Sequence, residues 1–191
     1  MLFRSAEARR EFPKISWIQG DITSWQPQLA PDLIFSNAAL QWVPSHEKLF
    51  VGLVQLLSAG GVLAVQMPRH FASPSHLELK EMVQQSRWRA RLEPLLLAEV
   101  PPPETYWRWL SRYVADLDIW ETIYLQVLQG DDPVVDFMRG TALRPFLTVL
   151  SKEEGAEFLR EFSRRMRAAY PPQSTGETLF PFRRIFMIAR R

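Results

Sequence analysis

Side chains that commonly serve as catalytic nucleophiles, bases or metal ligands are scarce in this 191-residue sequence, which contains no cysteine and only three histidines. The histidines, His46, His70 and His76, show neither the H-x-x-x-H spacing of a metal site nor the arrangement of a catalytic triad. We therefore expect no metal ligand and no catalytic nucleophile or base among them. The lack of cysteine also excludes disulfides and thiolate chemistry, which is consistent with a reducing compartment.

An acidic residue that could bind a nucleoside follows the first predicted strand. Ile15 to Ile18 alternates like a strand, and Gly20-Asp21-Ile22 comes directly after it. A carboxylate at a strand end can accept hydrogen bonds from the amino group of a nucleoside, while the next backbone N–H, that of Ile22, donates to a ring nitrogen. On these residues alone, an aspartate that simply stabilises a turn is the commoner case.

The stretch from Asp32 to Pro68 predicts a strand, a crossover helix and a second, parallel strand. Asp32 to Phe35 is a short apolar run that stops at Ser36-Asn37, as a strand buried on both faces of a parallel sheet ends at its carboxyl edge. Val62 to Val65 begins the second buried strand. Ligands of such sheets bind at the carboxyl edge of the strands, so this loop is a candidate site.

The helix between these strands is predicted to start at Ser45, whose side chain can cap it, and to end at Gly60-Gly61. Its apolar face consists of Leu49, Phe50, Leu53, Val54 and Leu57. The uncharged run from Leu49 to Pro68 is also about as long as a membrane span. Gly60-Gly61 in its middle and the amphipathic helix before them argue against that alternative.

The flanking segments complete an α/β pattern. They predict a charged helix from Ser5 to Phe12, a helix from Ser75 to about Arg91 with a Ser75/Glu78 capping box, a strand from Asp118 to Leu128, a helix from Asp132 to Gly140, a helix with a Ser151/Glu154 capping box, and a final strand from Leu179 to Ala189. The aromatic segment from Thr105 to Leu110 fits a cap over a site and, equally well, a packing patch between helix and sheet.

Charge and the N-terminal sequence narrow the class of protein. Lysine and arginine number 23 against 21 aspartate and glutamate, a net charge of +2, which gives little electrostatic reason to expect a nucleic-acid partner. Residues 1–10 contain no apolar segment of the secretory kind. We expect a cytoplasmic globular protein with one domain over residues 1–191, in which residues 75–115 are inserted as a helical cap.

Several segments resemble class I S-adenosylmethionine-dependent methyltransferases. GDITSWQP, DLIFSNAALQWVPSHEKLF and LLSAGGVLAVQMP are similar to the regions of their third, fourth and fifth strands. DLDIWETIYLQVL, GTALRPFL and YPPQSTGETLFPFRRIFMIARR resemble the closing strands and helices of members that methylate small polycarboxylates such as trans-aconitate. The resemblance covers essentially the whole sequence. It implies a Rossmann-like α/β sheet of order 3-2-1-4-5-7-6 and S-adenosylmethionine as cofactor.

The same resemblance implies roles for particular residues. It places Asp21 and Ile22 at the adenine and Asn37 and Ala38 along the methionine end of the cofactor, although Asn37 is also explained as a helix-start asparagine. A polycarboxylate substrate is bound best by arginine side chains, whose guanidinium groups bind carboxylates bidentately. The alternative for each candidate arginine is a surface salt bridge without a role in binding. The substrate-binding candidates are Arg183, Arg184, Arg144, Trp42, His70, Trp120 and Tyr124. A carboxylate nucleophile is already an anion at neutral pH, so positioning is the whole task and no base is expected.

One feature of that family is not found in this sequence. In the family a strand, a GxGxG loop and a second strand come before the matched segments, whereas no glycine precedes Gly20 here. Two alternatives follow: the chain is a fragment with a sheet truncated at its N-terminus, or it has re-paired its sheet. In the truncated case we expect weak cofactor binding and exposed apolar surface that favours self-association. Two functions remain: an O-methyltransferase that forms a methyl ester on a small polycarboxylate, or a truncated inactive remnant or carboxylate-binding module.

Overall fold

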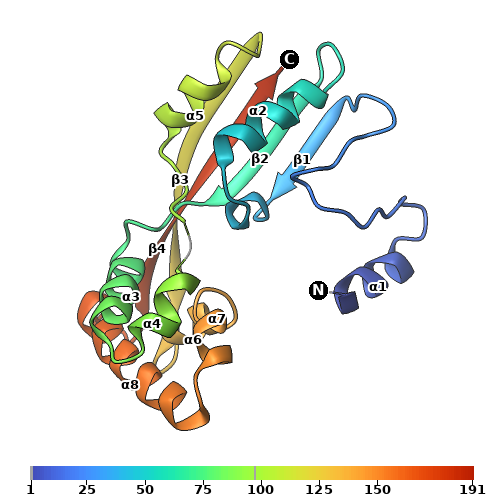
Figure 1. Cartoon of the computed structure of the whole chain (residues 1–191). Helices are drawn as coiled ribbons and strands as arrows, with labels where there is room; N and C mark the ends of the chain where they lie inside the picture. The colour runs from blue at the N-terminus through green and yellow to red at the C-terminus, as the bar shows by residue number, and fades with distance from the viewer. Residues whose placement is uncertain (1, 97) are drawn as a thin grey trace.

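The computed structural model describes residues 2–96 and 98–191, which contain a four-stranded sheet of order β1-β2-β4-β3 (Figure 1). The strands are β1 (Leu33–Asn37), β2 (Val62–Pro68), β3 (Asp116–Leu128) and β4 (Thr178–Arg190). β1 and β2 are parallel, whereas β4 is antiparallel to both of its neighbours, β2 and β3. This confirms the order expected for the fourth, fifth, seventh and sixth strands of the Rossmann-like sheet.

Two groups of helices pack on this sheet (Figure 1). α2 (His46–Leu56) connects β1 to β2 and, together with α5 (Pro103–Leu110), covers one face of the sheet. The second group surrounds the far ends of β3 and β4, and we call it the helical lobe. It consists of α3 (Pro74–Gln85), α4 (Arg89–Leu92), η2 (Glu93–Leu95), α6 (Pro133–Arg139), α7 (Arg144–Val149) and α8 (Lys152–Ala169).

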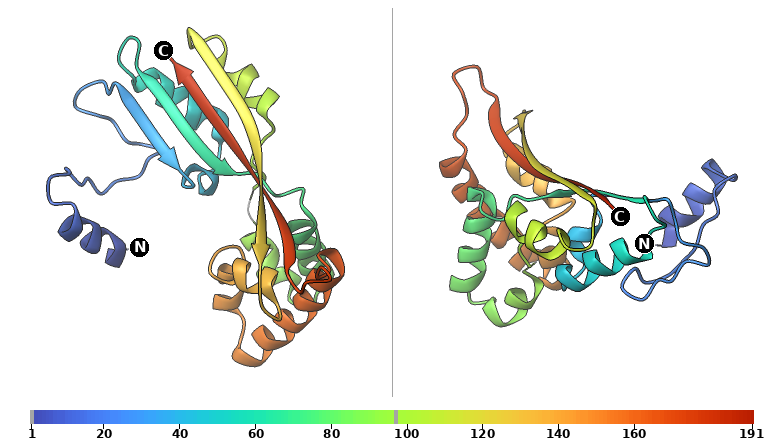
Figure 2. Two further views of the ribbon diagram at one scale, coloured as in Figure 1. Left: turned by 180° about the vertical axis from the view of Figure 1, so that it is seen from behind. Right: turned by 90° about the horizontal axis from the view of Figure 1, so that it is seen from above.

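Residues of β4 contribute to two different cores. Ile185 and Met187 are buried against α2 and α5, whereas Phe180 and Phe182 are buried in the helical lobe. The pairing of β3 with β4 continues in register across this change, so the two groups of helices contact opposite faces of one twisted ribbon. The face of β1 and β2 turned away from α2 therefore carries no helix among the described residues (Figure 2).

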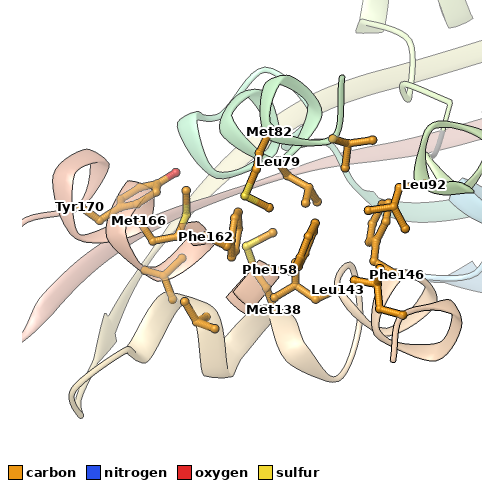
Figure 3. Close-up of a cluster of buried hydrophobic side chains, with 14 of the residues drawn as sticks. Leu79, Met82, Leu92, Met138, Leu143, Phe146, Phe158, Phe162, Met166 and Tyr170 are labelled. Atoms are coloured by element: carbon orange, nitrogen blue, oxygen red, sulfur yellow. The ribbon is translucent and has the colours of Figure 1, made fainter. Parts of the chain in front are cut away.

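The helical lobe has an apolar core of its own (Figure 3). Phe158 and Phe162 of α8 lie at its centre, between Met82 of α3 and Met138 of α6. α8 begins with the predicted capping box, in which Ser151 and Glu154 bind each other's backbone N–H groups. This core fixes the far ends of β3 and β4 relative to the sheet.

The predicted strand from Ile15 to Ile18 is wrong. This segment has no regular secondary structure, and Ile18 is 75% exposed. A strand is stable only when its backbone groups pair with a neighbour, and no described strand pairs with this one. The charged helix expected before it is confirmed as α1 (Leu2–Glu11), which stands apart from the sheet in Figures 1 and 2.

The strand predicted to be buried on both faces is instead the edge strand β1. Phe35 is 70% exposed and Leu33 58% exposed, because their side chains point to the face that no helix covers. On the other face Ile34 packs partly against the core of α2. An apolar run therefore predicted the strand correctly but not its environment.

Helix starts were predicted less well than helix faces. The apolar face of α2 is buried as expected, but Ser45 makes no capping bond and has a left-handed backbone (φ 57°). The Ser75/Glu78 capping box is also wrong, because α3 starts at Pro74 and Glu78 instead forms an ion pair with Arg165 at 2.9 Å. α3 ends at Gln85 rather than near Arg91.

The aromatic segment from Thr105 to Leu110 forms α5. Tyr106 and Leu110 are fully buried, and the Tyr106 ring lies 4.9 Å from that of Phe50 on α2. These side chains therefore pack α5 on the sheet, while α3 and α4 belong to the helical lobe. The division of the chain into a cap over residues 75–115 stays a prediction.

The uncharged run from Leu49 to Pro68 forms the end of α2, a turn and β2. Among the helices of the described residues, none has the length and apolar character to cross a membrane.

Candidate functional site

Buried polar atoms without partners gather at one edge of the sheet. Among the described residues, these atoms are Ser36 Oγ, Gln41 Oε1, Gln66 Nε2 and His70 Nδ1. Ser36 and Gln66 lie near the carboxyl ends of β1 and β2; Gln41, in the short helix η1 (Leu40–Trp42), and His70 follow those ends. Buried polar groups are normally hydrogen-bonded, so this concentration indicates where a polar ligand or ordered water completes the structure.

The two candidate arginines of β4 lie on opposite faces of the sheet. Arg183 shares the face of α5, where its Nη1 donates to Glu121 Oε2 at 3.1 Å, and Arg69 Nη1 donates to the other oxygen of that carboxylate at 2.7 Å. Arg184 Nη1 instead donates to Gln66 Oε1 at 3.0 Å on the other face. Because neighbouring residues of a strand alternate between faces, the two arginines do not form one clamp.

Arg184 is held in place without being neutralised. Its guanidinium lies 5.0 Å from the ring centre of Phe182 and 5.7 Å from that of Tyr124. Gln66 supplies a neutral acceptor, and no carboxylate of the described residues lies within 4.0 Å of Arg184. The positive charge is thus oriented by aromatic faces and an amide, and it remains available to an anion.

A row of side chains runs across the sheet beside Arg184. In the strand register Asn37 is opposite Gln66, Gln66 is opposite Phe186, and Phe186 is opposite Trp120. Trp120 stacks on Phe186 with ring centres 5.2 Å apart and an angle of 8° between the planes. The face that lacks a helix therefore presents a polar end at Asn37 and Gln66 and an aromatic wall at Trp120.

Ala38 turns the chain sharply at the end of β1. It has a positive φ of 52°, which is uncommon for a residue with a side chain, and its N–H donates to Gln66 O at 2.9 Å. Its carbonyl oxygen accepts from Gln41 Nε2 at 2.9 Å. The Ala38 amide is thus already used within the protein, whereas the Asn37 side chain is exposed at the edge.

His70 and His76 form a partly buried pair where the sheet meets the helical lobe. Their ring centres are 4.2 Å apart, and the His70 ring lies 4.7 Å from that of Phe182. Burial, and then the positive charge of Arg184, lower the pKa of His70 to about 4. Burial, and then His70, lower the pKa of His76 to about 3. Both rings are therefore neutral at pH 7, and neither adds a charge to the site.

Asp21 forms a turn in this structure. Its Oδ1 accepts from the Thr23 N–H at 2.9 Å and from the Thr23 hydroxyl at 2.8 Å, and these two bonds lower the pKa of the Asp21 carboxyl. Ile22 packs against the core of α2. The first oxygen of the carboxylate is thus engaged locally, while the side chain as a whole remains exposed to solvent.

The remaining predicted residues are scattered. Arg144 is exposed at the start of α7, in the helical lobe, and Trp42 is half-exposed at the end of η1. The structure therefore gathers Arg184, Tyr124 and His70 into one group, but it leaves Arg183 and Arg144 outside that group.

Gln66 is the residue that the sequence reasoning missed. It is 7% exposed and lies in an otherwise apolar strand, VLAVQMP. A single amide within such a run is an informative signal, because burying it without partners is unfavourable. The signal was present in the sequence, but its partner, Arg184, is 118 residues away.

A separate hollow of about 280 Å³ lies beside His76, among α3, residues 95–96 and 98–99, and the start of α7. Its walls are mostly apolar, and Lys80 at its side is paired with Glu99 at 3.6 Å. Such a lining suits an apolar group better than a polycarboxylate.

Comparison with curated proteins and solved structures shows the family and the fold of this chain. No family model matches the chain. It is 40% identical over 185 residues to trans-aconitate 2-methyltransferase of Azoarcus sp. (strain BH72), covering 96% of this chain and 72% of that protein. It is 41% identical over 188 residues to the protein of the same name from Methylobacterium nodulans, covering 97% and 73%.

Solved structures share the fold at low sequence identity. The YcgJ protein of Bacillus subtilis matches with a TM-score of 0.56 and 13% identity, over 98% of this chain and 76% of that one. Phosphoethanolamine N-methyltransferase 2 of Haemonchus contortus, in complex with S-adenosylhomocysteine, matches with a TM-score of 0.50 and 14% identity, over 97% and 39%. The sheet is thus that of class I methyltransferases, and the chain belongs to the trans-aconitate 2-methyltransferase family.

Proposed function

We propose that this chain transfers a methyl group from S-adenosylmethionine to a carboxylate of a small polycarboxylate of the trans-aconitate type, forming a methyl ester. The proposal is supported by the names of the relatives. One structural observation carries it: the charge of Arg184 is free of acidic partners within the described residues and adjoins the partnerless buried Gln66 Nε2. An anion bound there gains a charge-assisted hydrogen bond.

The residues at the carboxyl edge fit part of the cofactor. We assign the exposed Asn37 side chain to the methionine end, and Asp21 and Ile22 to the adenine. Ala38 would contribute shape rather than its N–H, because Gln66 already accepts from that group. Bound S-adenosylmethionine would supply an electrophilic methyl group. The protein then has only to hold the substrate carboxylate, already an anion, in line with that methyl.

We assign Arg184 to a substrate carboxylate and Trp120, Tyr124 and His70 to the walls around it. A guanidinium that donates hydrogen bonds to a carboxylate favours its ionised form. The carboxylate that accepts the methyl group therefore carries no proton, and no side chain has to remove one. Arg183, Arg144 and Trp42 are weaker candidates, because they lie elsewhere in the described structure. The expected cytoplasmic location stays a prediction.

The test is formation of the methyl ester of trans-aconitate from labelled S-adenosylmethionine, followed as a function of pH. At S-adenosylmethionine concentrations high enough to offset the weak binding expected above, we expect product, and a rate that shows no step near neutrality, because no histidine acts as a base. Arg184→Ala should abolish most of the rate, whereas Arg190→Ala, at the exposed far end of β4, should leave it unchanged.

Two other outcomes would contradict the proposal. A chain that binds trans-aconitate through Arg184 but forms no ester would be a carboxylate-binding module. A chain that neither binds nor methylates trans-aconitate would require a different substrate class.

A further inference from the structure

The side-chain amide of Gln66 has a fixed orientation. Its oxygen accepts from Arg184 Nη1 at 3.0 Å, and a guanidinium has donors only. The amide oxygen must therefore face Arg184, and the NH₂ group must point elsewhere. Unlike most glutamines, Gln66 cannot exchange its two ends without losing this bond.

The NH₂ group of Gln66 has no partner among the described residues, although the side chain is 7% exposed. Leu63, Val65 and Met67 pack in the core of α2, so Gln66 points to the opposite face of β2. Its neighbours across the strands there are Asn37 and Phe186. A buried donor is thus held between the residue assigned to the cofactor and the arginine assigned to the substrate.

We propose that Gln66 is a specificity-determining residue, whose NH₂ group donates to a second acceptor oxygen of the polycarboxylate that Arg184 binds. The inference rests on the proposed function and deepens it. Arg184 and Gln66 present two donors side by side, held together by their own hydrogen bond. Because the NH₂ group of Gln66 points away from Arg184, we expect the two donors to serve two different carboxylates. A monocarboxylate held by Arg184 then leaves the Gln66 donor unused, so the pair selects polycarboxylates.

Gln66 could instead serve only to hold Arg184, and two substitutions separate the roles. Gln66→Glu keeps an acceptor for Arg184 in nearly the same shape, but it removes the NH₂ donor and places a negative charge at the second carboxylate. Gln66→Met removes both ends of the amide with little change in volume. In Gln66→Glu the new carboxylate also pairs with Arg184 and weakens its hold on any carboxylate. A purely structural role of Gln66 therefore predicts equal losses for mono- and polycarboxylates in Gln66→Glu and an impaired Gln66→Met.

The first experiment is titration calorimetry of the chain with trans-aconitate and with crotonate, an unsaturated monocarboxylate. We expect Gln66→Glu to weaken trans-aconitate binding about 10-fold to 100-fold, as for loss of a hydrogen bond to a charged group, and to weaken it more than Gln66→Met does. Crotonate binding should change less than about 3-fold in Gln66→Met, and in Gln66→Glu it should fall less than trans-aconitate binding does, because pairing of the new carboxylate with Arg184 affects both acids whereas loss of the NH₂ donor affects only trans-aconitate. Thermal unfolding of each variant verifies that it is folded.

A second readout observes the donor itself. In the chain labelled with ¹⁵N-glutamine, the side-chain NH₂ signal absent from Gln66→Met belongs to Gln66. It should shift on addition of trans-aconitate and move little with crotonate. This measurement is made on the wild-type chain, so it stands even where a variant folds poorly.

The outcomes distinguish this inference from the proposed function. If wild-type chain binds no trans-aconitate, both are overturned. If it binds, and Arg184→Ala weakens binding while Gln66→Glu does not and the NH₂ signal stays still, the proposed function stands and the role of Gln66 is overturned. Equal losses for both acids in Gln66→Glu would also overturn it.

Discussion

The two faces of one sheet differ in what covers them. On the face of α2 and α5, side chains such as Leu63, Met187 and Phe50 are fully buried. On the opposite face, Phe35 and Trp120 are 70% and 40% exposed, and the buried Gln66 Nε2 has no partner among the described residues. The same backbone register produces both faces. The difference teaches that the face covered by α2 and α5 carries the stability of the sheet, whereas the uncovered face is the one on which we propose ligand binding.

The largest expected effect compares two phenylalanines. Phe50→Ala should lower the free energy of unfolding by about 3–5 kcal/mol, because it leaves a cavity between α2 and α5. Phe35→Ala, on the uncovered face, should change it by less than about 1 kcal/mol. Urea unfolding of both variants measures the difference. A similar loss for Phe35→Ala would mean that this face is covered in solution.

The histidine pair predicts a stability that depends on pH. Folding lowers the pKa values of His70 and His76 to about 4 and about 3, below the usual value of 6.5. As pH falls from about 6.5 to about 4, the unfolded chain therefore binds protons that the folded chain does not, and stability decreases. Above pH 6.5 both states are neutral, so no change is expected there.

The expected size is about 2–3 kcal/mol over that range, since one pKa unit corresponds to about 1.4 kcal/mol and the pair is partly exposed to solvent. Urea unfolding at several pH values, with the double substitution His70→Phe and His76→Phe as the reference, isolates this contribution. An equally steep loss in the double variant would assign the pH dependence to other groups, such as Glu154 and Glu161.

Arg183 and Arg184 lie on opposite faces of the sheet, so the activities of their variants compare the two faces directly. Arg184→Ala should reduce kcat/KM for trans-aconitate by about 10-fold to 150-fold, equivalent to about 1.5–3 kcal/mol, with cofactor affinity unchanged. Arg184→Lys should restore the charge but not the fork, so it should recover the rate only in part. Arg183→Ala, whose side chain binds Glu121, should stay within about 3-fold of wild type. The reverse order of the two Ala variants would place the site on the face of α5.

The smallest effect concerns the apolar surface of the uncovered face. Leu33 and Phe35 are exposed on β1, an edge strand, so the chain should self-associate and bind a hydrophobic dye. Changing both residues to Lys should reduce dye binding and association while altering the free energy of unfolding by about 0.5 kcal/mol or less. Light scattering and dye fluorescence test this. A wild-type chain that is monomeric and binds no dye contradicts the prediction.

Local patterns in the sequence predicted much of the architecture. Periodicity predicted the strand, helix and strand from Asp32 to Pro68 and the long strand β3. It could do so because the spacing of apolar residues within one short segment indicates which side chains share a face. The capping box at Ser151 was also predictable from short-range spacing. The strand at Ile15 was not, since a strand also needs a partner that periodicity cannot supply.

The candidate site was only partly predictable. The sequence and its resemblance identified the carboxyl edge of β1, the cofactor and the arginines of β4. Which arginine shares a face with Gln66 could not be read from Arg183-Arg184 alone, because either residue of a neighbouring pair can point to either face until the register with β3 and the packing of α2 are fixed.

By itself, then, the sequence determined the α/β pattern and the family, since these depend on residue type and short-range spacing, and it led to the expectation of a reaction that needs no base. Only the tertiary structure decided that Gln66 and Arg184 meet, that Arg183 binds Glu121 instead, and that His70 is partly buried near a positive charge. Each of these depends on residues far apart in the chain being brought within a few ångströms, and folding of the whole sheet, rather than any local preference, sets those distances.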